Sequence, residues 1–569
     1  MTLGVKESTI QASSPAPNQT VRSRLIALYS VTLVATAIVL PMCFLGNASG
    51  HDFQPHVASW IEAAGQWRQG IFFPRWAQWA NFGYGEPRFI FYPPASWMLG
   101  GALGSVLPWR MVPGAFVWLT IIAAGMSMWK LAREWLAPTQ AVAAAIFFAA
   151  NPYHLAIVYY RSDFAELLAG AFFPLMLWGA LGMIRGEWRR LPLLAIAFAG
   201  IWLSNAPAGV IATYSLALIL VAACVRGRSA RPLLLGGLGM FAGFGLAAFY
   251  LVPAWWEQRW VQISRTVATT YDPQRNFLFT RINDPDFIHF NWKISTLAAG
   301  VILFTALGVA SSFKHRRDLP HVWWLFLTLA VAAVFLMLPP SAFLWRHLPE
   351  LKFLQFPWRW LLVLNLIFAF FVAAARSPTR WWAWLTLACA MWATGAVIAG
   401  DTGWDNEDVP ALVEDVRAGR GYEGIEGFQP INANIDELDD ESPLVGEFDP
   451  EDGDVSEFDP ENGTVNIQKW TPETKVFDAT SEDAVTIGLR LFNYPAWDVR
   501  IDGNTVAAAT APKTGQILLP LAAGSHHIEI TFRRTRDRAV GALVSALFVA
   551  GLVLFVSFGF RSSRRKSLV

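Results

Sequence analysis

Charge and cysteine are both scarce in this sequence of 569 residues. Charged residues make up 15% of the chain, against about 25% in an ordinary soluble protein, and the formal net charge is +1. This balance excludes a protein that binds nucleic acid or another polyanion through bulk charge. The three cysteines lie inside apolar runs, which excludes a disulfide framework and a cysteine zinc site.

Apolar residues are abundant instead. They make up 54% of the chain, including 28 Trp and 41 Phe, and the mean hydropathy is +0.36. A soluble globule could not bury so much apolar surface, so the composition predicts a polytopic membrane protein. About 12 runs are read as membrane spans. They cover residues 25–44, 111–129, 139–158, 164–184, 191–205, 207–225, 232–252, 294–312, 321–339, 359–375, 381–400 and 538–560.

Basic clusters follow alternate runs, and cytoplasmic loops collect Lys and Arg. The first run follows Arg22 and Arg24 and is longer than a signal-peptide core, so it predicts an anchored helix with a cytoplasmic N-terminus. The shorter run 95–107 is interpreted as re-entrant or surface-lying, since a crossing there would invert every later cluster. Both termini are therefore expected in the cytoplasm.

This path predicts an α-helical polytopic membrane protein with a small extracytoplasmic antiparallel β-domain near the C-terminus. The expected order is a cytoplasmic tail 1–24, a membrane domain 25–400 with outer loops 46–94, 253–292 and 340–357, an acidic extracytoplasmic linker 401–472, a β-domain 473–537, a last transmembrane helix 538–560 and a basic cytoplasmic tail 561–569.

The β-domain is predicted from period-two alternation in its sequence. Adjacent strand residues point to opposite faces, so His526 and His527 should not share a metal. The acidic linker contains EFDPEDG at 447–453 and EFDPENG at 457–463. A calcium loop is one interpretation, but the spacing is not that of an EF-hand, which favours a solvated linker.

The first outer loop mixes acids, bases and aromatics. Asp52 and His56 lie four residues apart and share one face of an expected helix, although Asp52 also stands where an N-cap belongs. Farther along, Arg75, Glu86 and Arg88 lie among aromatic residues. An apolar surface that lies in the headgroup layer, together with these charges, suits a site that handles a lipid phosphate.

Further candidates lie in later outer loops. Asp163 and Glu166 begin a span and Arg161 precedes them; ionisable residues there are functional candidates, although acids in a first turn also stabilise the helix dipole. His154 lies near the outer end of its span, where a substrate-binding role and a structural role explain it equally well. Arg346 and Arg359 are candidates for binding phosphate oxygens. The charges of loop 253–292 fit a sugar-binding lid or a solvated loop equally well.

An acid in the first outer loop, a surface helix and then FYPP at 91–94 resemble the GT-C superfamily. Its members are multispan glycosyltransferases that use polyprenyl-phosphate-linked sugars. The resemblance implies that Asp52 is the catalytic base. It also implies a second acid in the second outer loop, the short segment around 153–163, where this chain has Asp163 after Tyr159, Tyr160, Arg161 and Ser162.

A closer resemblance is to bacterial membrane proteins called "6-pyruvoyl-tetrahydropterin synthase-related" and to the YfhO-like membrane proteins. It rests on the order of HDFQPH, PRWAQWANFGYGEPRFIFYPP, YRSDFAE, LKFLQFPWRW, GYEGIEGFQP, FNYPAWDVRIDG and LPLAAGSHHIEITF. The segment GYEGIEGFQP departs from the usual pattern, which weakens any role for Glu426. No soluble synthase domain is present, so the name implies no such activity. The resemblance implies location in a bacterial inner membrane.

The sequence thus predicts a GT-C glycosyltransferase that transfers a sugar from a polyprenyl-phosphate donor to an envelope glycan, lipid or protein on the extracytoplasmic face. The expected catalytic residues are Asp52 and Asp163, in one shared cavity. The expected substrate-binding residues are His56, Arg75, Glu86, Arg88, His154, Arg161, Arg346 and Arg359. A divalent cation held by Asp52, His56 and Asp163 is left open. The rival hypothesis is a non-catalytic GT-C-like carrier or envelope assembly factor.

Overall fold

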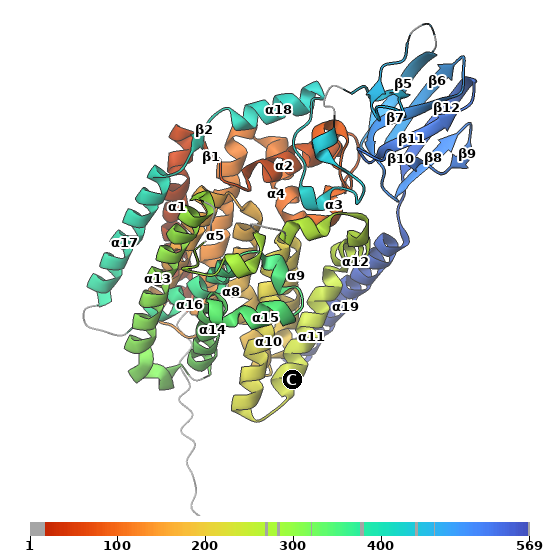
Figure 1. Ribbon diagram of the computed structural model, residues 1–569. Coiled ribbons are helices and arrows are strands. Elements are labelled where there is room, and N and C mark those ends of the chain that lie inside the picture. The colour runs from red at the N-terminus through yellow and green to blue at the C-terminus, as the bar shows by residue number, and fades with distance from the viewer. Residues whose placement is uncertain are drawn as a thin grey trace, which may run out of the picture.

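A computed structural model describes residues 17–267, 271–281, 285–319, 321–375, 380–438, 442–459, 461 and 463–566. A helical bundle makes up most of this part of the chain, and a β-domain stands at one end of it (Figure 1). Parts of several predicted features lie outside the described residues: most of the N-terminal tail, residues 268–270 and 282–284 of loop 253–292, residues 376–379 between two predicted spans and the last three residues.

One helix covers most of each predicted span. These helices are α1 (Pro17–Leu45), α5 (Val112–Ala132), α6 (Pro138–Ala149), α8 (Phe164–Ile184), α9 (Leu191–Ser204), α10 (Ala206–Gly227), α11 (Arg231–Leu246), α13 (Pro285–Ser312), α14 (Val322–Leu336), α16 (Leu361–Ala374), α17 (Arg380–Gly400) and α19 (Arg536–Lys566). The others are α2 (Phe53–Arg68), α3 (Arg88–Phe91), α4 (Pro94–Val106), α7 (Pro152–Ala156), α12 (Ala248–Glu257), α15 (Ala342–His347) and α18 (Asp408–Ala418).

Among the described residues, nine helices are long and apolar enough to cross a membrane, and up to 11 if each of two bent pairs forms one span. The bent pairs are α11 with α12 and α14 with α15. A multi-pass membrane protein is therefore what the structure describes. The predicted count of about 12 spans is not confirmed. The difference lies at 191–205, where α9 has only 14 residues and is about 21 Å long at 1.5 Å per residue. The orientation of the termini stays a prediction.

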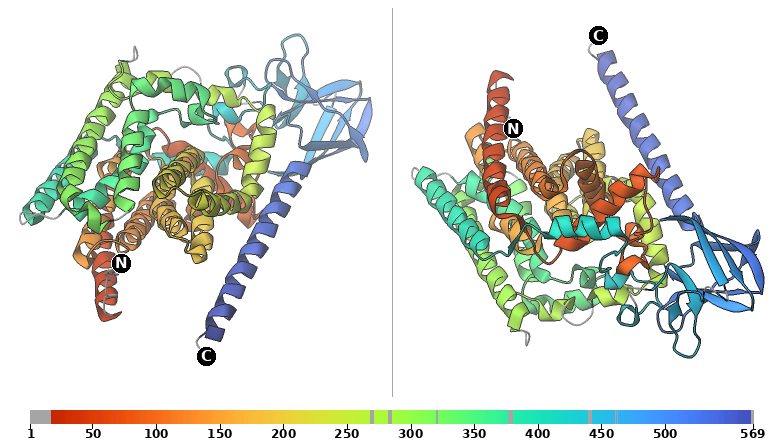
Figure 2. Two further views of the ribbon diagram at one scale, coloured as in Figure 1. Left: turned by 90° about the horizontal axis from the view of Figure 1, so that it is seen from below. Right: turned by 90° about the horizontal axis from the view of Figure 1, so that it is seen from above.

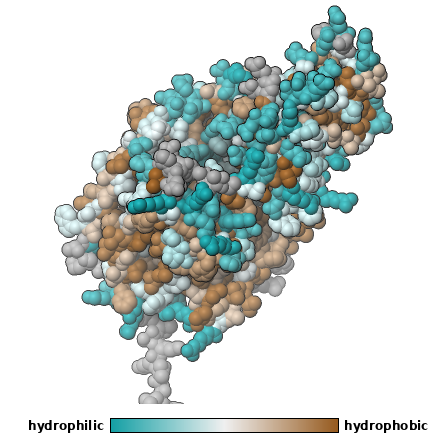
Figure 3. Space-filling view, viewed as in Figure 1, coloured by the Kyte–Doolittle hydropathy of each residue, from teal (hydrophilic) through white to brown (hydrophobic). Residues whose placement is uncertain are grey.

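The predicted re-entrant run is α4, a 13-residue helix that packs on α2. The close approach is possible because Gly100 has no side chain: a Cβ there would meet Trp60 ring atoms at 2.2 Å. At the centre of the bundle, every residue of α16 is buried, so this helix is surrounded by protein rather than lipid. Apolar side chains cover the helical body in Figure 3, and hydrophilic ones gather toward the β-domain.

The β-domain consists of two five-stranded sheets with strand orders β10-β11-β7-β3-β4 and β5-β6-β12-β8-β9. Their strands are β3 (Val445–Phe448), β4 (Val455–Ser456), β5 (Gly463–Thr471), β6 (Thr474–Ser481), β7 (Val485–Phe492), β8 (Trp497–Ile501), β9 (Asn504–Val506), β10 (Ala509–Thr510), β11 (Gln516–Leu521) and β12 (Gly524–Phe532). All pairings in both sheets are antiparallel, as predicted. A separate pair, β1 (Asn47–Ala48) with β2 (Trp404–Asp405), joins the first outer loop to the segment after α17.

The β-domain begins earlier than residue 473, because β3, β4 and β5 lie in the predicted acidic linker. The short strands β3 and β4 carry too few residues to show a period-two pattern. The two acidic repeats form matching turns: Asp449 accepts a hydrogen bond from Glu451 N at 2.7 Å, and Asp459 accepts one from Glu461 N at 3.0 Å. The repeated sequence thus has a structural explanation as two Asx turns.

On β12, the neighbouring histidines have different partners. His526 Nδ1 lies 2.7 Å from Asp502 Oδ2, whereas His527 Nδ1 lies 2.6 Å from Asp478 Oδ1. They do not share one site, in keeping with strand alternation.

The first outer loop and the β-domain share a core. Trp76 and Tyr84 of the loop pack with Trp497 and Phe492 of the β-domain, with ring centroids 5.2 and 5.6 Å apart respectively. The β-domain is therefore fixed to the loop that carries Asp52, rather than being tethered by the last helix alone.

Candidate functional site

The segment between α7 and α8 departs from regular helix. Residues Ile157–Arg161 form a π-helical turn, and Ser162 then takes the left-handed conformation at φ 53°. Asp163 is the N-cap of α8, and its Oδ1 accepts a hydrogen bond from Glu166 N at 2.9 Å. π-Helical turns are frequent at functional sites, and this one brings Arg161, Asp163 and Glu166 together.

The loop before α2 is held against this segment by backbone contacts. Ser162 Oγ donates to Ala48 O at 2.6 Å, and Asp52 N donates to Arg161 O at 2.8 Å. Gly50 allows the approach, because a Cβ there would lie 2.5 Å from the carbonyl carbon of Arg161. Two segments that are far apart in the sequence are thereby fixed side by side.

Asp52 stands at the N-cap position of α2, but its side chain makes no capping hydrogen bond. Its Oδ2 instead accepts a hydrogen bond from Arg161 Nη2 at 2.8 Å. The Asp52 side chain is 40% exposed, whereas that of Arg161 is 4% exposed. The capping interpretation of this side chain is therefore not what the structure shows.

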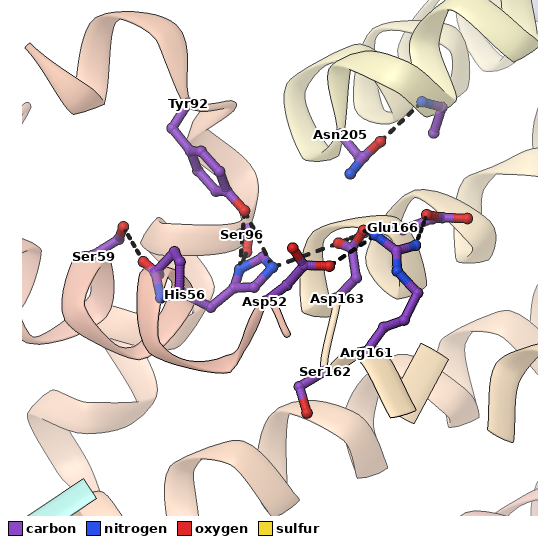
Figure 4. A network of polar contacts seen from close by, with 12 residues as sticks. Asp52, His56, Ser59, Tyr92, Ser96, Arg161, Ser162, Asp163, Glu166 and Asn205 are labelled. Atoms are coloured by element: carbon purple, nitrogen blue, oxygen red, sulfur yellow. Dashed lines mark hydrogen bonds and ion pairs between the residues drawn. The ribbon is translucent and has the colours of Figure 1, made fainter. Parts of the chain in front are cut away.

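Three carboxylates surround one guanidinium. Besides Asp52, Arg161 donates to Asp163 Oδ2 at 2.9 Å and to Glu166 Oε2 at 2.7 Å (Figure 4). We call Arg161 and these three acids the Arg161 centre. Both Asp52 and Asp163 accept from the same Nη2, so the two acids that the sequence predicted to share a cavity are direct neighbours.

The second arginine, Arg359, precedes α16 and lies against the same acids more loosely. Its Nε lies 3.4 Å from Glu166 Oε2 and its Nη2 3.8 Å from Asp163 Oδ2. The buried Tyr153 also donates its hydroxyl to Glu166. Arg161 thus donates hydrogen bonds to three carboxylates, whereas Arg359 makes only longer contacts with two of them.

His56 completes the cluster on the α2 side. Its Nε2 lies 3.5 Å from Asp163 Oδ1, and its ring is within 3.2 Å of the Tyr92 hydroxyl. Burial alone would raise the pKa of Asp163, but the charge of Arg161, the His56 hydrogen bond and Arg359 outweigh it and hold the pKa well below its usual range. Asp163 is therefore ionised at neutral pH.

A cavity of about 860 Å³ opens onto the Arg161 centre. Its polar end is formed by Asp52, Asn205, Arg161, Asp163 and Arg359. Its apolar side is formed by α9 to α12 and includes Trp202, Val210, Phe244, Leu251 and Trp255. Its lining also includes Ile263, Arg265, Thr266 and Glu423–Phe428. One cavity therefore joins a charged end to an apolar wall that belongs to the membrane helices.

Asn205 was not found as a candidate from the sequence. It caps α10, accepting a hydrogen bond from Ala208 N at 2.9 Å, and its amide faces the carboxylate cluster in Figure 4. Asn before an Ala-Pro helix start is a readable capping signal, but no sequence pattern places that cap beside Arg161. Tyr153 was also missed, because no sequence pattern places its hydroxyl beside Glu166.

Two predicted residues form a separate buried pair. Arg88 Nε donates to Glu86 Oε1 at 2.6 Å, and both side chains are 0% exposed. Glu86 Oε2 also accepts from Ile425 N at 2.9 Å, and Arg88 lies 5.1 Å from the centre of the Tyr422 ring. This pair ties the first outer loop to the segment after α18, and neither side chain lines the cavity.

Three more predicted substrate-binding residues lie away from the cavity lining. Arg75 pairs with Glu473 of the β-domain at 2.9 Å. Arg346 Nη2 donates to Gln274 at 3.3 Å. His154 is buried, with Nδ1 3.4 Å from Ala149 O and its ring against Phe148. These positions favour structural roles.

The residues offered for a divalent cation do not form a metal centre. In the part of the chain that the structure describes, no group of three or more His, Cys, Asp or Glu residues is arranged to hold a metal ion. Between Asp52 and Asp163, the guanidinium of Arg161 takes the position that a bridging cation would need. The donor set therefore does not fit a divalent ion in this arrangement.

No family model matches the chain, and no curated protein matches it. Among solved structures, the chain is similar to the archaeal oligosaccharyltransferase AglB from Archaeoglobus fulgidus, solved with an inhibitory peptide and a dolichol-phosphate. The TM-score is 0.43 at 13% identity, over 71% of this chain and 61% of that one. The apo form of the Archaeoglobus fulgidus oligosaccharyltransferase gives a TM-score of 0.43 at 15% identity, with the same coverage.

A further structure of the Archaeoglobus fulgidus oligosaccharyltransferase, in complex with Zn and sulfate, gives a TM-score of 0.38 at 14% identity, over 67% of this chain and 54% of that one. The chain thus spans about three fifths or less of these proteins. No residue role is transferred from such distant similarity. None of the comparisons supports the closer assignment to the YfhO-like or synthase-related proteins.

Proposed function

We propose that this protein is a membrane glycosyltransferase of the GT-C type, which transfers a sugar from a polyprenyl-phosphate donor to an envelope acceptor on the side of the membrane that carries the β-domain. The cavity is the observation that carries the proposal. It combines a half-exposed carboxylate, a loosely held arginine and an apolar wall of membrane helices. A lipid-linked sugar phosphate has matching parts: a polar reacting centre, an anion and a hydrocarbon chain.

Asp52 is the residue best placed to accept a proton. Its carboxylate is 40% exposed and lines the cavity, whereas the Asp163 and Glu166 side chains are 5% and 1% exposed. In the proposed step, the acceptor hydroxyl oxygen bonds to the anomeric carbon and its proton passes to Asp52. The bond between that carbon and the phosphate oxygen breaks, and the lipid phosphate leaves with the electron pair.

Arg359 is the residue best placed to stabilise the departing phosphate. A leaving phosphate gains negative charge, which a cation in a cavity of low polarity stabilises strongly. The contacts of Arg359 with Glu166 and Asp163, at 3.4 and 3.8 Å, leave room for a better ligand. Arg161 has no such freedom, since it donates to three carboxylates at 2.7 to 2.9 Å. Its role is to fix the position of Asp52.

The apolar wall suits the hydrocarbon chain of the donor. Trp202, Phe244 and Leu251 come from α9, α11 and α12 respectively and line the cavity on one side. A hydrocarbon chain placed along them would keep the phosphate at the polar end. Asn205, at the start of α10, lies between the two regions and has an amide group to offer to the phosphate or the sugar.

The test is turnover of polyprenyl-phosphate-linked sugars by the purified protein in lipid nanodiscs, comparing the intact chain with Asp52→Asn. The variant should retain its fold and lose turnover. Asp415→Asn is the matched control, because Asp415 is an exposed acid of α18 that pairs with Arg420. If donor binding is measurable but neither protein transfers any sugar, the rival hypothesis of a non-catalytic carrier or assembly factor is favoured.

A further inference from the structure

A second cavity, of about 720 Å³, lies where α12, α19 and the β-domain meet. In Figure 2, α19 runs beside the bundle and the β-domain stands at the helix's N-terminal end. Its lining includes two tryptophans, three arginines and one valine: Trp256, Trp260, Arg533, Arg534, Arg536 and Val540. None of these residues lines the cavity at the Arg161 centre.

The walls of this cavity are fixed by a buried ion pair. Arg538 of α19 donates from Nε and Nη2 to both oxygens of Glu257 in α12, at 2.6 and 2.7 Å. Tyr494 of the β-domain donates to the same carboxylate at 2.6 Å. Arg533 N also donates to Ala496 O at 2.9 Å. Three parts of the molecule are thus held in one geometry around the cavity.

The charge on the lining is positive. Three arginines contribute to it, and Asp537 is the one acidic residue among the lining residues. Arg533 lies 3.6 Å from Asp498, a long contact, and Arg534 and Arg536 are exposed. The first turn of α19 adds backbone N–H groups that also favour an anion. Lys and Arg are enriched in cytoplasmic loops, so the positive-inside trend does not explain three arginines on the predicted outer side. A bound anion would explain them.

The cavity also lies at the membrane boundary. The apolar span in α19 begins at Arg536, and the bent pair of α11 and α12 extends to Trp260. Trp255 and Trp256 are 68% and 41% exposed there, as is typical of residues in the headgroup layer. Below the cavity, α19 exposes Val540, Leu543 and Leu547, which share one helix face at spacings of three and four. An anion bound here would have an apolar track beside it.

We propose that this cavity binds the phosphate headgroup of an anionic membrane lipid, with the acyl chains lying along the Val540 face of α19. Arg534 and Arg536 contact the phosphate, and Trp256 covers it from α12. A bound lipid of this kind would fasten the β-domain to the membrane surface beside the catalytic cavity. The proposal does not depend on the proposed transferase activity, because the two cavities have separate linings.

The test is native mass spectrometry of the full-length protein released from nanodiscs of phosphatidylcholine that contain phosphatidylglycerol. The intact protein should retain one phosphatidylglycerol that phosphatidylcholine does not replace. The double variant Arg534→Ala/Arg536→Ala should bind that lipid at least about tenfold more weakly, since charge-assisted hydrogen bonds to phosphate are lost. Soluble glycerol phosphate should not occupy the site, because it lacks the acyl chains.

Arg417→Ala/Arg420→Ala is the matched control, with the same loss of charge at two exposed arginines near the C-terminal end of α18. It should retain the lipid. In nanodiscs of phosphatidylcholine alone, all three proteins should have the same melting temperature, because the Glu257–Arg538 pair is untouched. Equal lipid loss in both double variants would show a nonspecific effect of charge and overturn the site. Full retention of the lipid by Arg534→Ala/Arg536→Ala would overturn it as well.

Discussion

Two arginines near the first outer loop are buried among carboxylates, and they differ in what surrounds them. Arg161 donates to Asp52, Asp163 and Glu166, and one of these acids is 40% exposed in a large cavity. Arg88 donates to Glu86, and both are 0% exposed. The two centres contain the same chemical groups. Access to a cavity distinguishes a candidate catalytic centre from a structural one.

Two buried carboxyl groups, Glu62 near Arg88 and Asp163 beside Arg161, respond differently to burial. Burial raises the pKa of Glu62, near Arg88, and hydrogen bonds from Trp79 and Gln66 only partly oppose this. Near Arg161, burial of Asp163 is outweighed by the charge of Arg161, by the His56 hydrogen bond and by Arg359, and its pKa is lowered. Several cations and donors around one acid thus keep a buried carboxylate ionised.

The largest expected effect separates the two centres by activity. Asp52→Asn should lower sugar turnover per folded molecule by about 10²-fold or more, the order expected for loss of a general base. Its folded yield should stay near that of the intact protein, since the Asp52 side chain makes no capping hydrogen bond. Glu86→Gln should do the reverse, with less folded protein and nearly normal turnover per folded molecule. Equal losses of turnover in both variants would remove the distinction.

The second effect is on stability. Arg88→Met should lower the free energy of unfolding by about 3–5 kcal/mol, because it leaves Glu86 as a buried, uncompensated charge. The melting temperature in detergent is the measurement. Arg420→Met is the control, because Arg420 pairs with Asp415 on the surface, where ion pairs contribute little to stability. Similar melting temperatures for the two variants would contradict a structural role for Arg88.

The third effect is on donor binding. Arg359→Ala should weaken binding of a polyprenyl-phosphate-linked sugar by about 1.5–3 kcal/mol, the range for a hydrogen bond to a charged group. Arg359→Lys should restore only part of this, because an ammonium cannot form the same fork. Arg346→Ala is the control, because Arg346 contacts Gln274 and does not line the cavity. Unchanged binding by Arg359→Ala would place the phosphate elsewhere.

The smallest effect concerns pH. The pKa of Asp163 is lower in the folded protein than its ordinary value, so its ionised form contributes stability above that value. This contribution is lost as the pH falls from about 3.9 toward the folded pKa. Asp163→Asn keeps a capping oxygen but cannot ionise, so its melting temperature should fall less steeply over this acid range. Identical pH profiles for the two proteins would show that Arg161 does not hold Asp163 ionised.

The sequence predicted much of the fold and part of the site. Long apolar runs predicted membrane helices, and alternation predicted the antiparallel β-domain. The count of about 12 spans is not confirmed at α9, because residues 191–205 are apolar enough for a span but form only a 14-residue helix. The strands β3 and β4 were not predicted, because strands of four and two residues are too short to show a period-two pattern.

For the site, Asp52, His56, Arg161, Asp163 and Arg359 were predicted, and the structure brings them together. Arg88 was predicted by the same reasoning, yet it lies in a sealed pair. Arg88 and the residues of the cluster are the same kinds of charged side chain, and all were predicted in or next to outer loops. What differs is whether the neighbours leave an opening, and that depends on side chains from distant parts of the chain.

By itself, the sequence determined that the chain is a multi-pass membrane protein with a β-domain, because hydropathy and strand alternation are local properties of consecutive residues. It also determined which acidic and basic residues are available near the membrane helices. Only the tertiary structure decided that Arg161 joins Asp52 to Asp163 while Arg88 is enclosed. That choice depends on the close approach at Gly50, on the π-helical turn before Ser162 and on the packing of α9 to α12, which bring residues more than a hundred positions apart into contact.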